Sequence, residues 1–409
     1  MAGTYTTNEQ LHAAGLRDAG AATRPGKSTL PVSAHLTLIT TLPSLAALEK
    51  PWLALEHAAV NAPSVFQSYG WVSSWAKTYA TEESATELCV IAGFDQDELV
   101  FVLPLMKEKT GPVKVLRWLS EPFGQYGDAL IAASQTIKPW FDSAIAFIRR
   151  LKDIDVIRLR HIREDSAVAD YCKTNFVDAR LDEKAPFLDL TAYASEEGYE
   201  ARYTSSQRKR RKKIRKELEE MGVVEFKLLP SGPQGDAALT EAIAEKNLWL
   251  EERGRQNRAL RCPRMLNFLK DLSRTKNTDL AVEISELRAG DRPISWELGF
   301  NFRNTHFAYI TSHVNALTNL SPGRLHMDLS QRHCIRQGLK KFDLLVPHDQ
   351  HKESWSSDFM RTHDYYLPLT PVGRIYGQIF LRTLRPIIRR MYYKSPQWFL
   401  RLVKPIFGM

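Results

Sequence analysis

The segment from residue 305 to residue 347 constrains the fold more than any other part of this chain. It begins with the apolar stretch THFAYITSHV, passes through a Ser-Pro-Gly turn at residues 321–323, and ends in FDLLVP. Apolar residues recur at helical spacing from the turn up to Leu339, so the predicted order is strand, tight loop, helix, strand. A helix that begins where a strand ends presents free backbone N–H groups and the positive end of its dipole, which suits an anion such as a phosphate.

The rest of the second half supplies a sheet and further helices. DLAVEISELRAG and RPISWELGFNF, together with THFAYITSHV, predict three antiparallel strands, and VVEFKLL predicts another. The RPISWELGFNF strand places its large apolar side chains on one face: Ile294, Trp296, Leu298, Phe300 and Phe302. Apolar stripes and a C-terminal Gly222 predict helices over residues 205–221, 236–253 and 263–276.

The first half follows the same order of elements. Strands are predicted at HLTLIT, ELCVIAGF, ELVFVLPLMKEK, VKVLRWLS, YGDALI, DVIRLRHI and APFLDL, and helices over residues 44–59, 66–79 and 138–151. Helices that alternate with strands after an antiparallel hairpin predict an α/β (α+β) fold with two lobes, each a mixed, mostly antiparallel sheet flanked by helices.

Composition bounds the class of protein. The 409 residues are 44% apolar, which is enough for a folded core. The four cysteines, at positions 89, 172, 262 and 334, show no CxxC spacing and no associated histidine cluster, so we expect no metal and a reduced, cytoplasmic protein. Residues 1–34 are small and polar, lack the apolar core of a secretory signal, and are expected to form a mobile tail. No apolar run reaches the length of a membrane span.

The net charge of +9 comes from two short segments. Eight of the nine residues 208–216 are basic, and residues 371–409 carry eight basic residues and no acidic one. The remainder of the chain is therefore mildly acidic. We expect an N-terminal lobe over residues 35–190, a C-terminal lobe over residues 191–370 and a basic amphipathic tail over residues 371–409.

Several ordered pieces carry a family resemblance. They are RPISWELGF (292–300), SPGRLHMDL (321–329), GLKKFDLLVP (338–347) and HKESW (351–355), with FQSYGWVSSW (66–75) and EPFGQYGDALI (121–131) in the first half. Over roughly residues 36–370 the chain resembles the cellulose-biosynthesis (CelD-like) branch of the GNAT acyltransferases, which is related to the Fem-type transferases. The resemblance implies two GNAT-like lobes, of which the second holds the cofactor.

That resemblance implies an acyl-CoA, acetyl-CoA first among them, as the anion at the Ser-Pro-Gly loop. Ser321, Gly323, Arg324 and Leu325 occupy the position that holds the coenzyme A pyrophosphate in GNAT proteins. Gly323 would let the backbone approach the phosphates, and Arg324 could add a charged contact. The alternative is an ordinary Pro-Gly turn that starts a helix.

Acylation of an amine needs a group that takes the proton of the amine, and an acid for the leaving thiolate can assist. Four candidates lie on the second-half strands: Glu297, His313, Tyr309 and Asp343. Glu297 could face a cleft as base, His313 could act as base beside the cofactor loop, and Tyr309 could donate to the thiolate. Each also has a structural interpretation: a solvated carboxylate, a loop hydrogen bonder, a core tyrosine and a helix cap or ion-pair partner. No cysteine has a partner for nucleophilic work, so direct transfer is expected.

The acceptor is expected between the lobes, where small-molecule sites commonly lie. Tyr126 and Asp128 in QYGDAL, with Lys352 and Trp355 in HKESW, are the candidates that would line it. Aromatic and carboxylate groups suit a sugar or an amino compound, and they serve equally well in structural contacts.

The basic segments leave alternatives open. The run 208–216 lacks interleaved aromatic residues, so we expect a solvated helix face and no nucleic-acid partner. In residues 371–409 apolar and basic side chains separate onto two helix faces, which fits either an anionic inner-membrane surface or packing on the protein body.

The predicted function is an acyl-CoA-dependent acyltransferase of polysaccharide or envelope synthesis that acts on a small-molecule acceptor. A Fem-like aminoacyl-tRNA-dependent transferase and a non-catalytic membrane scaffold are the alternatives.

Overall fold

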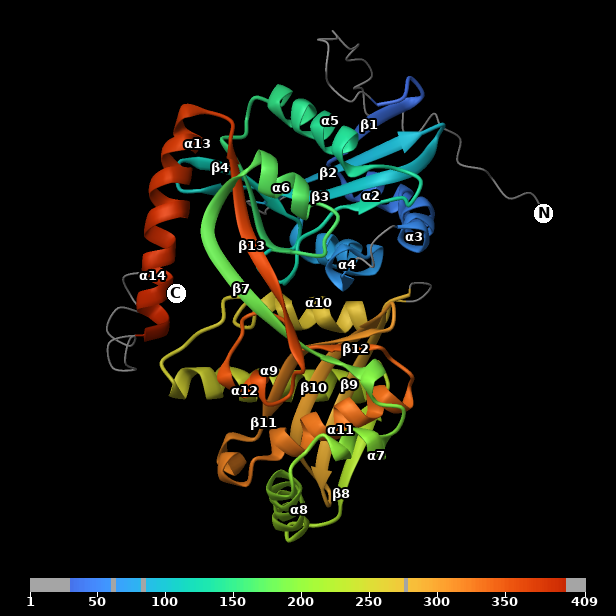
Figure 1. Cartoon of the computed structure of the whole chain (residues 1–409), viewed down its shortest axis with the longest axis vertical. Coiled ribbons are helices and arrows are strands. Elements are labelled where there is room, and N and C mark those ends of the chain that lie inside the picture. The colour runs from blue at the N-terminus through green and yellow to red at the C-terminus, as the bar shows by residue number, and fades with distance from the viewer. Residues whose placement is uncertain (1–29, 60–63, 82–85, 276–278, 395–409) are drawn as a thin grey trace, which may run out of the picture.

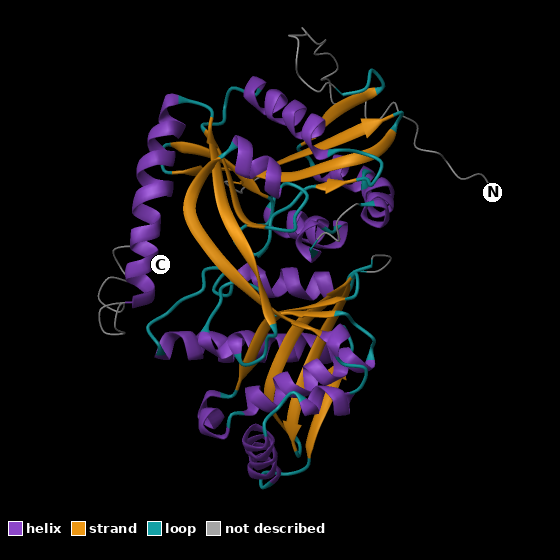
Figure 2. Cartoon of the chain, viewed as in Figure 1, coloured by secondary structure: helices purple, strands orange, loops and turns teal. Residues whose placement is uncertain are grey.

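One sheet runs through the whole molecule. The computed structural model describes residues 30–59, 64–81, 86–275 and 279–394. Within these residues thirteen strands form a single sheet in the order β1-β2-β3-β4-β6-β13-β7-β12-β11-β10-β9-β8, and β5 pairs beside β3. Figure 2 shows helices on the faces of this sheet at both ends of the molecule. The predicted α/β class with two lobes is confirmed, but the two sheets are joined.

The first lobe is a β-meander followed by a parallel crossover. Its strands are β1 (Ala34–Ile39), β2 (Thr86–Asp95), β3 (Glu98–Thr110), β4 (Val113–Trp118), β5 (Leu130–Ile131), β6 (Val156–Arg163) and β7 (Val177–Asp189). Its helices are α2 (Leu42–Ala47), α3 (Glu49–Ala58), α4 (Tyr69–Tyr79), α5 (Ile137–Arg150) and α6 (Ala169–Asn175). The predicted YGDALI strand is reduced to β5.

The second lobe repeats this plan. Its strands are β8 (Val224–Leu229), β9 (Ala281–Ala289), β10 (Arg292–Phe302), β11 (Thr305–His313), β12 (Lys341–Asp343) and β13 (Asp358–Pro368). Its helices are α7 (Glu196–Ala201), α8 (Ser205–Glu219), α9 (Pro233–Glu252), α10 (Pro263–Ser273), α11 (Pro322–Arg336) and α12 (Gln350–Glu353). The basic helix α8 begins with a full capping box between Thr204 and Gln207, which explains why so charged a segment starts a helix there.

Each lobe gives its last strand to the other. β7 ends the first lobe but pairs with β12 of the second, while β13 ends the second lobe but pairs with β6 of the first. β7 and β13 also pair with each other, and Figure 1 shows both long strands crossing from one lobe to the other. Of β7 only the APFLDL end was predicted, and β13 was not predicted. β7 has six charged residues among its thirteen, because alternate side chains along much of the strand face solvent. In β13 the apolar residues do not alternate regularly with polar ones.

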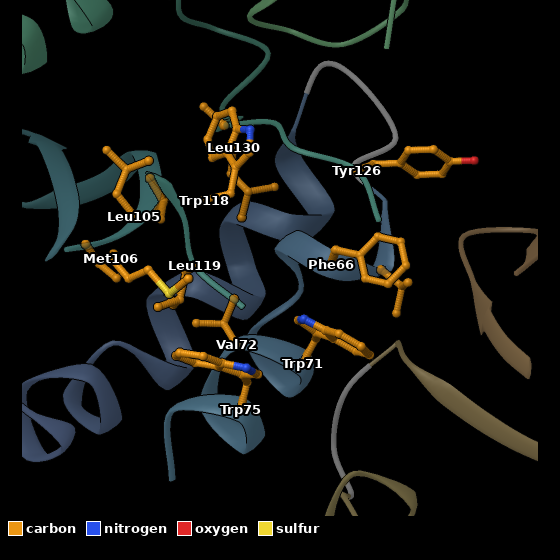
Figure 3. Packing of buried hydrophobic residues seen from close by; sticks show 14 of the residues in the cluster. Phe66, Trp71, Val72, Trp75, Leu105, Met106, Trp118, Leu119, Tyr126 and Leu130 are labelled. Carbon is orange, nitrogen blue, oxygen red and sulfur yellow. The ribbon is translucent and has the colours of Figure 1, made fainter. Parts of the chain in front are cut away.

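An aromatic core also joins the lobes. Trp71 on α4 packs edge-to-face against Phe66, Phe268, Phe300 and Tyr309, with ring centroids between 4.9 and 5.7 Å apart. Its indole Nε1–H donates to the Ser120 hydroxyl at 2.8 Å. Figure 3 shows Trp71 in the buried cluster beside Phe66. Side chains from both lobes thus share one hydrophobic interior.

The C-terminal segment is a continuous helix built from α13 (Pro371–Ile375), a π-helical stretch η4 (Tyr376–Leu384) and α14 (Arg385–Lys394). Tyr376, Phe380 and Leu381 pack onto the sheet against Val113, Val156 and Tyr366. The remaining residues of the predicted tail, 395–409, and residues 1–29 of the predicted N-terminal tail lie outside the described residues. No helix in the described ranges combines the length and apolar character needed to cross a bilayer.

The shared sheet and core predict that both lobes unfold in one transition. Trp71→Ala should lower the free energy of unfolding by about 3–5 kcal/mol, because it empties the centre of the joint core. Denaturant unfolding followed by tryptophan fluorescence and by circular dichroism would measure both effects. Leu248→Ala, at a half-exposed position, is the control and should change the free energy of unfolding by less than about 0.5 kcal/mol. Two separated transitions in the wild-type chain would contradict the prediction.

Candidate functional site

The strands β11 and β12 separate soon after they meet. They pair in parallel only from Thr305 to Phe307 on β11 and from Lys341 to Asp343 on β12. β11 continues to His313, while the chain after Asp343 leaves β11 and keeps a backbone hydrogen bond to β7 from Leu344 to Pro186. Beyond Phe307 no described strand pairs with this edge of β11, so its backbone N–H and C=O groups are available to an extended ligand.

The start of α11 lies at the end of this open edge. A short 3₁₀ helix, η3 (Asn315–Leu320), separates β11 from α11, where a simple tight loop was predicted. Ser321 is the N-cap, in the left-handed region with φ 56°, and its side chain does not cap the helix. Pro322 occupies the first turn and contributes no N–H. The Arg324 N–H already donates to the Ser321 carbonyl at 3.0 Å, so the N–H of Gly323 is the donor of the first turn that suits an anion.

Gly323 lies beside His313. The strained backbone conformation falls on Ser321, whereas a Cβ at Gly323 would lie 3.4 Å from Nδ1 of His313, an ordinary van der Waals distance. The close approach of backbone and phosphate at Gly323 stays a prediction. Leu325 is buried in a cluster with Ile214 and Ile294, so its contribution to an anion site is limited to its backbone.

Basic side chains converge on this helix start. Burial and the nearby Arg210 and Arg211 lower the pKa of Arg324. Burial, followed by the charges of Lys246 and Arg253, lowers the pKa of His313 and keeps it neutral. Arg324 has no carboxylate partner in the part of the chain that the structure describes. Arg211 pairs with Asp328 at 3.1 Å, Arg253 lies 3.8 Å from Glu252, and the charge of Asp349 acts on Lys246, so acidic residues compensate part of this positive charge. The positive charge that remains favours an anionic ligand.

Lys246, Trp249 and Arg253 were missed by sequence reasoning. Both cations lie over the Trp249 ring, with Lys246 Nζ at 4.9 Å and the Arg253 guanidinium at 4.1 Å from its centroid. Burial is the main cause that lowers the pKa of Lys246. Their spacing of three and four residues places them on one face at the end of α9. From the sequence alone, this spacing could have predicted a basic and aromatic cluster.

Glu297 faces the interior and not a cleft, which corrects the expectation. Its carboxylate accepts a hydrogen bond from the Ser330 hydroxyl at 2.5 Å and lies 3.1 Å from Nε2 of His306, beneath α11. Burial alone would raise the pKa of Glu297, but His306 and Ser330 outweigh it and lower that pKa. Burial opposes a charge on His306, but Cys334 and Glu297 raise the pKa of His306 well above its usual value. Burial raises the pKa of the Cys334 thiol, which disfavours the thiolate form that a nucleophile needs.

Tyr309 is held in the joint core. Its hydroxyl donates to the backbone carbonyl of Phe123 at 3.0 Å, and burial raises its pKa. The hydroxyl would have to break this bond before it could donate to a thiolate.

Two predicted residues from different lobes meet where β11 and β12 separate. The Tyr126 hydroxyl donates to Asp343 Oδ1 at 2.7 Å, and Arg163 lies 3.3 Å from Oδ2. The backbone N–H of Leu345 also donates to Oδ1, at 2.8 Å. Burial, followed by the Asp343 charge, raises the pKa of Tyr126 well above its usual value, so Tyr126 stays a donor.

Of the other predicted acceptor-binding residues, Lys352 contacts the chain just after Asp343, whereas Asp128 and Trp355 lie inside the lobes. Lys352 Nζ donates to the carbonyls of Leu345 and Pro347, and burial lowers its pKa to about 8. Asp128 accepts backbone N–H bonds from Ala129, Ala167 and Val168 inside the first lobe, and burial raises its pKa to about 7. Trp355 is 2% exposed and packs in the cluster beneath α11. Asp128 and Trp355 therefore do not line a cleft. Within the described ranges no three His, Cys, Asp or Glu side chains are grouped as a metal site.

Comparisons with known proteins concern the fold and the second lobe. Residues 205–353 match the sequence model of the acetyltransferase (GNAT) domain family. FemX is similar in structure, with a TM-score of 0.57 at 10% identity, over 81% of this chain and 98% of that one. A conserved protein of unknown function from Bacteroides thetaiotaomicron VPI-5482 gives a TM-score of 0.53 at 10% identity, over 81% and 100% of the two chains.

A third similar structure is the C-terminal domain (DUF2156) of a protein described as a lysylphosphatidylglycerol synthetase from Agrobacterium fabrum. Its TM-score is 0.50 at 10% identity, over 83% of this chain and 96% of that one. The comparison with curated proteins found no match to this chain. At such low identity the structures show a shared fold. The family match places a GNAT acetyltransferase domain in the second lobe, which confirms the predicted enzyme class, whereas the CelD-like branch stays a prediction.

The buried Glu297–His306 pair predicts a pH-dependent stability. Glu297→Gln should lower the free energy of unfolding by about 1.5–3 kcal/mol at pH 6, because it removes a hydrogen bond between charged groups. The loss should shrink as the pH rises above about 6.5, since the raised pKa of folded His306 stabilises the native state only while that histidine holds its proton. Urea unfolding of both proteins between pH 6 and 9 would measure it. A loss that grows with pH would contradict the assigned pair.

Proposed function

We propose that this protein transfers an acyl group from an acyl-CoA, acetyl-CoA first among them, to an amine or hydroxyl of a sugar or amino compound. The observation that carries the proposal is the uncapped, electropositive start of α11 at the end of the open β11 edge. We place the reaction in polysaccharide or envelope synthesis, and this placement depends on the sequence resemblance alone.

The residues present fit an acyl-CoA. The backbone N–H groups at the start of α11, with Arg324, Lys246 and Arg253, would hold its phosphates. The unpaired edge of β11 offers backbone partners to the amide groups of its extended arm. When bound, the acyl-CoA supplies a thioester carbonyl that an acceptor amine or hydroxyl can attack.

In this proposal Asp343, with Tyr126 and Arg163 beside it, acts on the acceptor and accepts its proton. Asp343 is buried, with 2% of its surface exposed, at the point where β12 leaves β11. We assign to it the acceptor's proton, which requires the acceptor to reach this carboxylate between the two strands. Tyr126 and Arg163 fix the orientation of that carboxylate through the contacts described above. His313, next to Gly323, belongs with the phosphate-binding end. Direct transfer needs no enzyme nucleophile.

An aminoacyl-tRNA-dependent reaction is the second candidate. The exposed face of α8 that carries Lys209, Arg210, Lys212, Lys213 and Lys216 forms one open basic surface. The charges of Arg210 and Arg211 also influence Arg324 at the start of α11. A basic surface that continues to the proposed site would suit the phosphates of a tRNA better than those of a small cofactor.

Acyl-CoA should raise the melting temperature of the purified chain. Ligand at a hundred times its Kd stabilises the native state by about 2.7 kcal/mol. Thermal unfolding with CoA, acetyl-CoA and longer acyl-CoAs would measure this. Gly323→Trp and Arg324→Glu should abolish the shift, because the first places a large ring against His313 and the second reverses a charge at the helix start.

Arg258→Glu reverses a charge at an exposed position outside the site and is the matched control, which should keep the full shift. If no acyl-CoA stabilises the wild-type chain, the proposal fails. Stabilisation by aminoacyl-tRNA alone would support the second candidate.

Asp343→Asn should lower kcat by at least about 100-fold, the usual contribution of a general base. Release of the CoA thiol would be followed with the fastest acceptor from a panel of amino sugars and amino acids. Tyr126→Phe keeps the Asp343 carboxylate and removes only its donor, so this variant should lose less of kcat than Asp343→Asn. Full activity of the Asn variant would exclude Asp343 as the base.

A further inference from the structure

The C-terminal helix carries a second apolar row that the protein body does not cover. While Tyr376, Phe380 and Leu381 face the sheet, another set of apolar side chains is between 43% and 62% exposed. This set, here called the outer row, is Val372, Ile375, Ile379, Leu384, Ile387 and Met391. In Figure 1 the helix from α13 to α14 lies at the outer edge of the molecule, beside β7 and β13.

The outer row is continuous because its spacing follows the type of helix. Its members are three or four residues apart in α13 and α14, where a turn takes 3.6 residues. Within the π-helical stretch Tyr376–Leu384 the step from Ile379 to Leu384 is five residues, which matches the wider π turn. The π turns thus keep both ends of the row on one side of the helix.

The charge of the helix indicates what covers this row. Residues 371–394 contain six basic residues and no acidic one. Arg385 and Arg389 turn inward and pair with Asp364 and Glu183 of the sheet. Arg374 and Arg390 are exposed close to the outer row. The accessible face therefore combines an apolar row with positive charge.

We propose that this face binds the surface of an anionic phospholipid bilayer, with the outer row in the interface and Arg374 and Arg390 at the lipid phosphates. An amphipathic basic helix with a narrow apolar row has the properties of a segment that lies in the membrane plane. A second copy of the chain is a poorer occupant, because two such helices would bring their exposed arginines together. This surface is independent of the proposed acyl-CoA site.

Sedimentation of the full chain with phosphatidylcholine vesicles, with and without phosphatidylglycerol, tests the proposal. The wild-type chain should bind the vesicles that contain phosphatidylglycerol. Ile375→Asp combined with Ile379→Asp should lower the bound fraction at least about tenfold, because both charges enter the apolar interface. Arg374→Gln combined with Arg390→Gln should remove the preference for phosphatidylglycerol.

Val223→Asp combined with Leu228→Asp is the matched control, since it changes two exposed apolar residues of the second lobe and should leave binding unchanged. Circular dichroism establishes that each variant is folded. Wild-type chain that stays in solution with both vesicle types, or an Ile375 and Ile379 variant that binds as well as wild type, would overturn the proposal. A dimer, seen by light scattering, that the aspartates dissociate would assign the row to a second copy instead.

Discussion

The pairing of β7 with β13 is the contact on which the rest of the molecule depends. It makes one sheet from two lobes, and it places β12 beside β7 and β6 beside β13. Because β12 is held by β7 from one side, it can leave β11 after three residues without losing its place. The Tyr126–Asp343 hydrogen bond lies at this point of separation, the open edge of β11 begins there, and α11 starts beyond the other end of that edge. The proposed site is therefore a consequence of how the lobes are joined.

In the first lobe two parallel strands also separate after a short pairing, and buried charged side chains lie beside them. β4 and β6 also pair in parallel over only three residues, Val115–Arg117 with Val156–Arg158. Just after β4 the buried carboxylate of Glu121 holds Arg158 and Arg160 at 2.7 and 2.9 Å. Arg160 also contacts Asp364 of β13. These buried cations of the first lobe are paired in an internal ion-pair network, where in the second lobe we propose a site for an anionic ligand.

The sequence predicted the elements well where apolar periodicity was strong. The hairpin of β2 and β3, the long α9 and the strand-helix order from β11 to α11 all follow from local pattern. Two things depended on tertiary structure. The exchanged strands lack a regular apolar alternation, in β7 because of its many charged residues. A bulge between Pro293 and Ser295 turns Ile294 to the opposite face from Trp296.

The site was only partly predictable for a similar reason. Ser321 and Arg324 are recognisable beside the Pro-Gly turn, but Lys246, Trp249 and Arg253 come from a helix more than sixty residues earlier. No linear motif connects these segments. Likewise, the alternation in β10 predicts that Glu297 leaves the apolar face, but it cannot show that α11 covers the opposite face. Burial on both sides of a strand is a property of packing.

The exchange of strands has a consequence for how the chain is made. β13, the strand that covers the open edge of β6, is encoded almost two hundred residues after β6. A ribosome must therefore synthesise nearly the whole second lobe before the first can be completed. Until then the emerging chain exposes a strand edge of the kind that recruits chaperones or mispairs with a neighbouring copy. The same topology that creates the site leaves the nascent protein open for most of its synthesis.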